Sequence, residues 1–237
     1  MILSLILIGT SGYTYPWNKG KSNKFEWYLD QGFNSVEING SFYRFPTENW
    51  INNWNVKTRR NFRFSIKVNR SITHYTRLKG NKSVNLWTKF KKSLEPIEEK
   101  ISFYLFQMPS SFKYTQENLD RLTTFKKKAD LDSKVIVEFR DASWWNKTSI
   151  AQLENIKISI CSVDAPLLPK KIFNLNNTIY LRLHGSKSWY NYLYSEKEIK
   201  KIMDKVEKKT ANKKAIYLNN DHGMLPNGKY LMKYLLN

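Results

Sequence analysis

Polar side chains that could do chemistry recur in this chain directly after short apolar runs. In the stretch 134–145, the β-branched run 135–137 is followed at once by Glu138 and then by Arg140. A carboxylate or a guanidinium at the end of a buried strand costs free energy of folding unless it is paired, hydrated or used. In parallel α/β folds, ligands bind at the carboxyl ends of the strands. This stretch therefore predicts part of an active site.

The same arrangement predicts further site residues along the whole chain. At expected strand ends they are Glu37, Asn39, Lys67, Gln107, Glu138, Arg140, Asp164, Arg182, His184, Asn219, Asn220 and Asp221, and in the loops they are Tyr13, Trp17, Tyr43, Arg70, His74 and Trp144. In a barrel of parallel strands, side chains at the strand ends converge on one pocket at the carboxyl-terminal rim. We therefore expect one polar site there, with catalytic and substrate-binding members.

Two mechanisms fit these residue types equally well. In the first, Glu37, Glu138, Asp164 and His184 are catalytic and hold one or two divalent metal ions, since carboxylate oxygens and imidazole nitrogens are common metal ligands. The metal would activate water or polarise an oxygen, while the lysine and arginine side chains clamp a phosphate. Barrels that isomerise sugars share this logic, so a metal-dependent sugar or sugar-phosphate isomerase is an alternative function.

In the second mechanism no metal binds. Glu138 or Asp164 acts as the general base and His184 or His74 as the acid, while the cations hold an anionic substrate. The sequence contains no motif for an organic cofactor. Each member also has a structural alternative, of which Glu37 is the clearest case. Because Glu37 lies inside its expected strand, it could simply form an ion pair with Lys67 or Arg182 inside the barrel.

The charge balance suggests an anionic partner. Lys and Arg total 40 against 20 for Asp and Glu, which gives a formal charge of +20. Such a field attracts polyanions, and Trp17, Tyr43 and Trp144 could stack on bases. A non-catalytic nucleic-acid-binding protein is therefore another alternative. The chain is also rich in Lys, Asn and Ile together, which an A/T-biased coding sequence would produce without selection for binding.

Size and composition favour one globular protein without a membrane segment. The chain has 237 residues with 41% hydrophobic residues, enough for a sizeable core in one domain over 1–237. No apolar stretch reaches the length that a membrane span needs. Cys161 is the only cysteine, so no internal disulfide can form, and we expect a cytoplasmic protein.

Strand and helix patterns alternate along the chain, which predicts an α/β fold with a parallel sheet. Eight strand signals in this length predict a single compact (β/α)8 barrel of the TIM type, with a doubly wound open sheet as the alternative. The expected strands cover 3–8, 35–38, 62–68, 101–106, 135–137, 157–161, 179–183 and 215–218.

Helix signals fall between most of these strands. Thr47 is an expected N-cap, and Ser195 with Glu198 forms an expected capping box. No helix is expected between the sixth and seventh strands, where a proline-bearing crossing runs to about residue 177. The expected helices cover 24–31, the stretch after Thr47, the stretch from 84, the stretch from 115, 148–154, the stretch after Ser195, and 229–236.

Short motifs, found in order from one end of the chain to the other, resemble the YecE-like family, catalogued as domain of unknown function 72. The resemblance implies a TIM-barrel-like fold and no settled reaction. The motifs are Gly9-Thr10-Ser11-Gly12-Tyr13 with Trp17, Val36-Glu37-Ile38-Asn39 with Phe42-Tyr43 and Pro46, Ile72-Thr73-His74, Gln107-Met108-Pro109-Ser110, Glu138-Phe139-Arg140 with Ser143-Trp144, Val163-Asp164 with Pro166, Arg182-Leu183-His184-Gly185, and Asn219-Asn220-Asp221.

The combined expectation is a barrel enzyme that acts on an anionic, phosphate-containing substrate, with nucleic acid among the candidates. Hydrolysis or phosphodiester cleavage is the leading reaction class, because the expected site combines acids, bases and several cations. The sequence leaves the identity of the substrate, the presence of a metal and the oligomeric state open.

Overall fold

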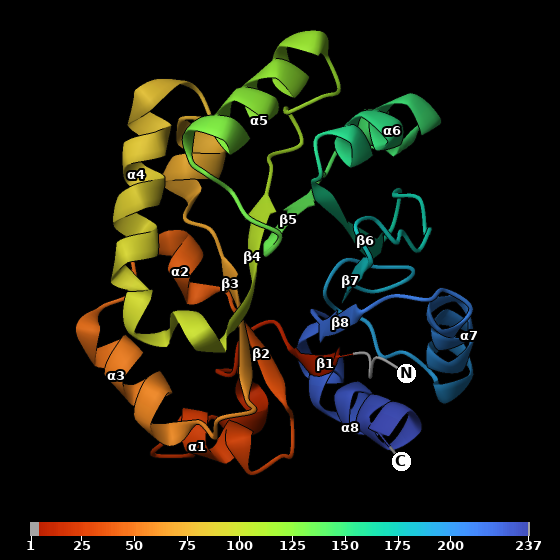
Figure 1. Cartoon of the computed structure of the whole chain (residues 1–237). Helices are drawn as coiled ribbons and strands as arrows, with labels where there is room; N and C mark the ends of the chain where they lie inside the picture. Colours follow the sequence, from red (N-terminus) through yellow and green to blue (C-terminus); the bar gives the residue numbers. More distant parts are fainter. Residues whose placement is uncertain (1–4, 237) are drawn as a thin grey trace. The chain divides into compact units, whose positions relative to one another are not determined.

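A computed structural model describes residues 5–236 and contains eight strands that alternate with helices over those residues (Figure 1). The strands form one sheet in the order β1-β8-β7-β6-β5-β4-β3-β2. The strand pairs β1–β8, β3–β4, β4–β5, β5–β6, β6–β7 and β7–β8 are all parallel. This sequential order is that of a (β/α)8 fold of the TIM type, which confirms the predicted fold class.

All eight expected strands are present, and one of them is displaced. The sixth was expected to end at Cys161, but β6 continues to Asp164 because Ser162 and Asp164 find buried partners for their polar atoms. Residues 3 and 4 of the first expected strand lie outside the described residues. The strands are β1 (Leu5–Thr10), β2 (Ser35–Ile38), β3 (Arg63–Lys67), β4 (Ile101–Gln107), β5 (Val135–Glu138), β6 (Ser159–Asp164), β7 (Thr178–Leu183) and β8 (Lys213–Leu218).

The helices follow the expected order. They are α1 (Lys24–Leu29), α2 (Gly40–Tyr43), α3 (Glu48–Lys57), α4 (Gly80–Ser93), α5 (Gln116–Lys128), α6 (Lys147–Asn155), α7 (Glu196–Glu207) and α8 (Met224–Leu236). Five shorter helical segments also occur within residues 5–236, namely η1 (Pro16–Asn18), η2 (Ser71–Tyr75), η3 (Glu95–Lys100), η4 (Ala142–Trp145) and η5 (Asp221–Gly223).

Two helices begin earlier than expected. The helix α4 starts at Gly80 rather than at residue 84, and α8 starts at Met224 rather than at residue 229. Gly228 lies inside α8, and a Cβ on Gly228 would lie 2.6 Å from the Phe33 ring. Close packing on Phe33 thus accounts for a glycine inside the helix and outweighs its poor helix propensity.

The expected caps are present. Thr47 accepts a hydrogen bond from the backbone of Trp50 at 3.4 Å. Ser195 Oγ accepts from the Glu198 backbone at 3.3 Å, and the Glu198 carboxylate accepts from the Ser195 backbone at 2.9 Å. These side chains satisfy backbone N–H groups that have no partner inside the helix, so local sequence fixes where α3 and α7 begin.

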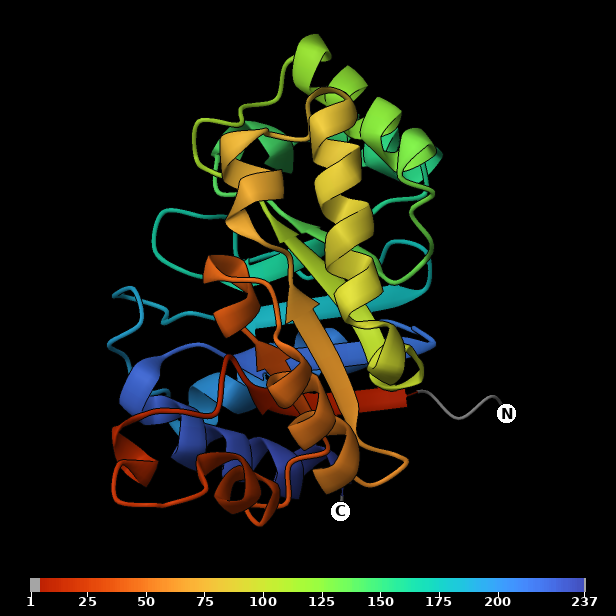
Figure 2. The same ribbon diagram turned by 90° about the vertical axis from the view of Figure 1, so that its left-hand side faces the viewer.

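The chain divides into two compact units. The first unit comprises residues 5–38, 61–63 and 161–236 of the described chain, and the second comprises 39–60 and 64–160. In the second unit, α4 and α5 lie side by side (Figures 1 and 2). In the first, 165–177 joins β6 to β7 without a helix, as expected (Figure 1). None of the helices among residues 5–236 is long and apolar enough to cross a membrane.

Candidate functional site

The predicted site residues belong to both compact units, and the structure groups them within each. That they all share one pocket stays a prediction. The first unit holds Tyr13, Trp17, Glu37, Asp164, Arg182, His184, Asn219, Asn220 and Asp221, and the second holds Asn39, Tyr43, Lys67, Arg70, His74, Gln107, Glu138, Arg140 and Trp144.

In the first unit, Glu37 and Arg182 form a fully buried ion pair. The Arg182 guanidinium lies 2.7 Å from Glu37 Oε1, and both side chains are 0% exposed. Ser11 Oγ donates to the same oxygen at 2.7 Å, and the Tyr180 hydroxyl donates to Oε2 at 2.6 Å. Burial raises the pKa of Tyr180, so its hydroxyl keeps its proton and remains a donor. The structural alternative for Glu37, a partner within the fold, is the arrangement found.

Strand alternation explains this network and two of its members that sequence reasoning missed. Side chains two residues apart in a strand share a face, so Tyr180 lies beside Arg182 on β7. That spacing was a usable signal for Tyr180. Ser11 precedes Gly12 in the loop after β1, where an isolated parallel bridge joins it to Glu37. Only this long-range pairing brings the serine hydroxyl to the carboxylate.

His184 is also completely buried in the first unit. Asn219 Nδ2 lies 3.0 Å from His184 Nδ1. An amide nitrogen can only donate, so this contact makes Nδ1 the acceptor and places the ring proton on Nε2. The rings of Trp189 and Tyr190 lie 5.3 and 5.7 Å from the His184 ring. His184 and Asn219 are therefore in contact, and the rings of Trp189 and Tyr190 lie beside the imidazole.

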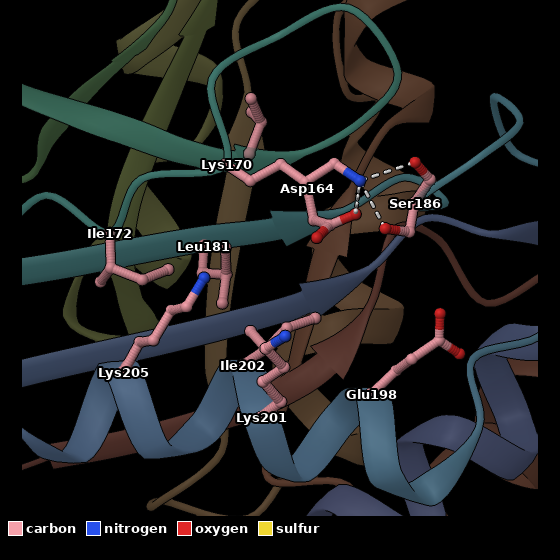
Figure 3. A pocket seen from close by; sticks show the side chains of 10 residues that line it. Asp164, Lys170, Ile172, Leu181, Ser186, Glu198, Lys201, Ile202 and Lys205 are labelled. Carbon is pink, nitrogen blue, oxygen red and sulfur yellow. Dashed lines mark hydrogen bonds and ion pairs between the residues drawn. The ribbon is translucent and has the colours of Figure 1, made fainter.

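Asp164 lies at the end of β6 with partners that the sequence did not suggest. The Tyr194 hydroxyl donates to Asp164 Oδ1 at 3.1 Å, and Lys170 Nζ lies 3.9 Å from the same oxygen. Lys170 also donates to the Ser186 carbonyl at 2.7 Å (Figure 3). Burial raises the pKa of Tyr194, so the hydroxyl stays protonated. Loop residues have no periodic pattern, so neither Tyr194 nor Lys170 could be found from spacing.

Asn220 was predicted to bind substrate, but its amide nitrogen holds the loops of the first unit together. Asn220 is 0% exposed, and Nδ2 donates to the Tyr192 carbonyl at 2.7 Å and to Asn227 Oδ1 at 2.9 Å. Its neighbour Asp221 is half-buried and begins η5. A structural role therefore accounts for the amide of Asn220.

The aromatic loop residues of the first unit pack mainly on α1. Trp17 stacks on Tyr15 with ring centroids 5.5 Å apart and lies 5.4 Å from Trp27. Tyr13 lies 4.8 Å from the Phe25 ring. Tyr13 and Trp17 are each half-buried, so part of each ring remains accessible.

In the second unit, His74 lies in a π-helical turn, η2, which is a form of helix often found at functional sites. The Thr76 backbone closes the turn by donating to the Ser71 carbonyl at 3.0 Å. His74 Nδ1 lies 2.9 Å from Thr73 Oγ1, and the imidazole meets the Phe42 ring edge-on at 5.0 Å. The side chain is half-buried, so the turn presents His74 with part of its ring exposed.

Positive charge surrounds this imidazole. Burial, followed by the charges of Lys67, Arg140, Arg77 and Arg70, lowers the pKa of His74 from 6.5 to about 4. His74 is therefore neutral near pH 7, when it can accept a proton. Arg77 was not predicted as a site residue, because it lies in the loop before α4 and ends no strand.

Phe42 links Lys67 to His74. Lys67 Nζ lies 4.2 Å from the centroid of the Phe42 ring, and the same ring contacts His74. Ser41 Oγ donates to the Lys67 carbonyl at 2.6 Å, which ties the end of β3 to α2. The predicted residue Asn39 directly precedes α2. One aromatic side chain thus separates a lysine amine from a neutral imidazole.

Glu138 and Arg140 form the second buried pair of a carboxylate and a guanidinium. Arg140 Nε lies 2.5 Å from Glu138 Oε1, and the side chains are 14% and 0% exposed. Arg140 also donates to Gln107 Oε1 at 3.3 Å. Gln107 on β4 is the register partner of Glu138 on β5, so sheet pairing brings these predicted residues together.

Arg70 lies between two exposed tyrosines. Its guanidinium is 5.6 Å from the Tyr43 ring and 5.5 Å from the Tyr75 ring. These tyrosines are 66% and 68% exposed, so solvent reaches much of each side chain. Tyr43 was predicted, whereas Tyr75 was missed although it directly follows His74.

Trp144 was predicted as a stacking surface for a ligand, and the structure corrects this. The side chain is 0% exposed and its indole nitrogen donates to the Phe112 carbonyl at 2.7 Å. Its ring is stacked against Phe139 at 4.0 Å and against Phe112 at 5.8 Å. Because aromatic rings of the second unit stack on Trp144, it belongs to the core.

The predicted metal ligands have protein partners within the described residues. No group of three or more His, Cys, Asp or Glu side chains that could hold a metal ion occurs among residues 5–236. Among the predicted ligands, Glu37 accepts three hydrogen bonds and Glu138 is paired with Arg140.

Comparison with known proteins identifies the family. Residues 7–233 match the model of the family described as "Protein of unknown function DUF72". The chain is 24% identical to the UPF0759 protein YunF of Bacillus subtilis, over 98% of this chain and 95% of YunF. It is 29% identical to the UPF0759 protein YecE of Escherichia coli K12, over 46% of this chain and 39% of YecE.

A solved structure supports the same assignment. The crystal structure of a DUF72 family protein from Thermotoga maritima MSB8 superposes with a TM-score of 0.84 and 27% identity, covering 98% of this chain and 99% of that one. The family model, YunF and this structure each match nearly the whole chain. They confirm the YecE-like resemblance, and this chain belongs to the DUF72 family.

Proposed function

We propose that the second unit binds a phosphate-containing substrate and hydrolyses a phosphodiester bond in it. The proposed site is the His74 surface, which consists of Tyr43, Lys67, Arg70, His74, Tyr75 and Arg140. One observation carries the proposal, namely that a half-buried neutral imidazole is surrounded by cations beside two exposed tyrosines.

Phosphate is the ligand that these cations suit best. Arginine guanidinium groups donate in a fork that matches phosphate oxygens, and a lysine amine adds a compact positive charge. The charges of Lys67, Arg70 and Arg140 all lower the pKa of His74, and Lys67 and His74 contact the same Phe42 ring. We propose that these cations act on one phosphate group. Their charges would offset the negative charge of the phosphoryl oxygens in the transition state.

His74 is the proposed general base. It takes a proton from the attacking water while the water oxygen forms a bond to phosphorus and the bond to the leaving oxygen breaks. A bound phosphate offsets the surrounding positive charge, which raises the pKa of His74 toward neutral pH, where a general base works best. Glu138 or Asp164 was the expected base, with His184 or His74 as the acid. Within the second unit, the pairing of Glu138 with Arg140 suits it better to orienting that guanidinium.

The overall charge of +20 does not carry this proposal. Exposed lysines occur on helices of both units, for example Lys127 on α5 and Lys200 on α7. That distribution fits compositional bias as well as it fits binding. The cations around His74 are different because they act on one imidazole, and one of them, Arg70, lies beside two exposed tyrosine rings.

A non-catalytic role in binding single-stranded nucleic acid is the second candidate for the same surface. Tyr43 and Tyr75 flank Arg70 and are mostly exposed. Bases stack on such rings without sequence preference, while cations contact the phosphates. In this case the protein would bind oligonucleotides without cleaving them.

The proposal can be tested with a panel of substrates and matched variants. The panel contains phosphomonoesters, bis(p-nitrophenyl) phosphate, and single- and double-stranded DNA and RNA, each assayed with chelator and with added Mg, Mn or Zn. We expect turnover of a phosphodiester that is lost in His74→Ala and reduced in Lys67→Met. Lys127→Met removes the same charge from an exposed position on α5 and should leave turnover unchanged.

Three outcomes separate the candidates. Turnover that survives in His74→Ala would contradict the proposed catalytic site. Salt-sensitive binding of single strands without turnover, weakened by Tyr43→Ala and Tyr75→Ala, would favour the binding role. Turnover that appears only with added metal would favour the metal-dependent mechanism instead.

A further inference from the structure

A pocket separate from the His74 surface lies entirely within the first unit. It lies beside the segment 165–177, which joins β6 to β7 without a helix. It has a volume of about 270 Å³ and lies among β6, β7, the segment 165–177 and α7 (Figure 3). Its apolar lining includes Ile172, Leu181 and Ile202. Small-molecule sites are typically clefts of about 300–1,000 Å³, so this pocket suits a ligand of metabolite size.

The missing helix explains why the pocket exists. Leu181 and Arg182 are neighbours on β7, so they point to opposite faces, and Leu181 faces the side that a connecting helix would normally cover. The segment 165–177 crosses there instead and is tied to β6 where the Phe173 backbone donates to Ser162 Oγ at 2.9 Å. This extended segment leaves space between itself and α7.

Three charged groups that line the pocket already have partners. Lys170 contacts Ser186 and Asp164, and Asp164 also accepts from Tyr194. Glu198 accepts from the Ser195 backbone at 2.9 Å, from Ser195 Oγ, and from Tyr192. Asp164 is thus paired with Lys170, whereas these donors to Glu198 are neutral and hold its carboxylate at the N-terminus of α7.

Lys201 and Lys205 are the remaining charges of the lining. Among residues 5–236, neither lysine forms an ion pair or a side-chain hydrogen bond. They lie four residues apart on α7, so they share a face of that helix with Ile202 between them in sequence (Figure 3). Like charges at this spacing repel each other, and an anion between them would remove that cost.

We infer that this pocket binds a small amphiphilic anion. A carboxylate or phosphate group pairs with Lys201 and Lys205 at the rim, and a short apolar chain packs on Ile172, Leu181 and Ile202. The inference does not rest on the proposed phosphodiesterase activity, because none of its residues belongs to the second unit.

The test follows the isoleucine methyl groups of the full-length protein by NMR during titration. The probes are hexanoate, hexyl phosphate and uncharged hexanol, so the two anions separate a carboxylate ligand from a phosphate ligand. We expect saturable shifts of the Ile172 and Ile202 signals with at least one anion and weaker binding of hexanol. Ile150 on α6, in the second unit, should not shift.

Charge-matched variants test the role of the two lysines. Lys201→Gln with Lys205→Gln should weaken anion binding by about two- to fivefold for each exposed ion pair removed. Lys197→Gln with Lys200→Gln makes the same change on the same helix outside the lining and should not alter affinity. Ile172→Trp should fill the pocket and abolish binding with both lysines present.

Several results would overturn the inference. They are the absence of saturable shifts with both anions, equal affinity for hexanol, and equal weakening by the two lysine pairs. His74→Ala in the second unit should leave the shifts unchanged, so failure of the proposed phosphodiesterase activity would not be mistaken for failure of this site.

Discussion

Each unit contains a carboxylate and an arginine paired at the end of a strand, and the two pairs differ in what surrounds them. Glu37 and Arg182 are each 0% exposed, and both carboxylate oxygens of Glu37 accept further hydrogen bonds from protein side chains. Glu138 is equally buried, but Arg140 is 14% exposed and acts on a half-buried histidine. The same residue types thus make a sealed pair in one unit and part of an accessible cationic surface in the other.

This difference predicts that the Glu37–Arg182 pair matters mainly for stability and that the Glu138–Arg140 pair matters mainly for ligand binding. Removing one partner of a sealed pair leaves a charge in a medium of low dielectric, which is strongly destabilising. In the second pair only Arg140 reaches solvent, while Glu138 is 0% exposed. Removing Arg140 opens its part-exposed position to water beside the Glu138 carboxylate, so the loss should affect ligand binding more than folding. The predictions below therefore measure stability in the first unit and binding in the second.

The largest effect is expected from Arg182→Met. This change leaves Glu37 buried without its counter-charge and should lower the free energy of unfolding by about 3–5 kcal/mol. Urea unfolding followed by circular dichroism measures the loss. Arg121→Met, in the exposed pair with Glu117 on α5, serves as the control and should cost about 0–1 kcal/mol. Equal losses of unfolding free energy in the two variants would show that the buried Glu37–Arg182 pair stabilises the fold no more than an exposed pair does.

A smaller effect on stability and a clear effect on binding are expected from Arg140→Met. Loss of a charge-assisted contact should weaken binding of a phosphodiester to the His74 surface by about ten- to a hundredfold. The change in unfolding free energy should be smaller than for Arg182→Met. Isothermal titration with a non-hydrolysable phosphodiester measures the affinity, and Arg59→Met, exposed in the same unit, is the control. If Arg140→Met lowered the free energy of unfolding as much as Arg182→Met, the two ion pairs would contribute equally to stability.

The sequence predicts the strands and helices of the fold better than it predicts the partners and burial of the site residues. Strand runs, the cap at Thr47 and the capping box at Ser195 depend on residues close in the chain, and the structure contains all of them. The extra residues of β6 were missed because Asp164 gains its buried partner from Tyr194, which lies 30 positions away in the chain. Long-range partners of this kind cannot be inferred from local periodicity.

The same limit applies to the site residues. Glu37 and Glu138 look alike in the sequence, since each ends or nearly ends a strand, and only the neighbouring strands decide which is sealed. Trp144 looked like a ligand platform because it follows Arg140 closely, but stacking with Phe112 buries it. Tyr75 escaped notice because it ends the short helical turn η2, and Arg77 because it lies in the loop before α4, where no spacing rule applies.

Because of His74, the stability of the second unit should depend on pH. The neighbouring cations should help to set the pH range over which stability changes. The pKa of His74 is about 4 in the folded protein against an ordinary 6.5, so the unfolded chain binds the proton first. Folded-state stability is therefore lost as the pH falls from about 6.5 to about 4, and it is unaffected by this group at higher pH. NMR titration of the imidazole should show the low pKa and a rise toward 6.5 in Lys67→Met.

The control for this titration is Lys127→Met, which should leave the pKa of His74 unchanged because that lysine is not among the charges acting on it. His74→Gln should remove the loss of stability between about pH 6.5 and 4. Binding of phosphate should also raise the pKa of His74, which can be followed as proton uptake on binding. If His74 titrated near pH 6.5 in the folded protein, the neighbouring cations would not be acting on it, and the second unit would lack the cationic surface described above.

The smallest effect is expected from Ser11→Ala in the sealed pair. This change removes one donor to Glu37 Oε1, but Arg182 still contacts that oxygen and Tyr180 still donates to Oε2. No acceptor is left without a partner, so the unfolding free energy should fall by only about 1 kcal/mol. Ser110→Ala, exposed in the second unit, is the control and should have no measurable effect. A loss as large as that of Arg182→Met would mean that the hydroxyl, rather than the guanidinium, is the main stabilising partner of Glu37.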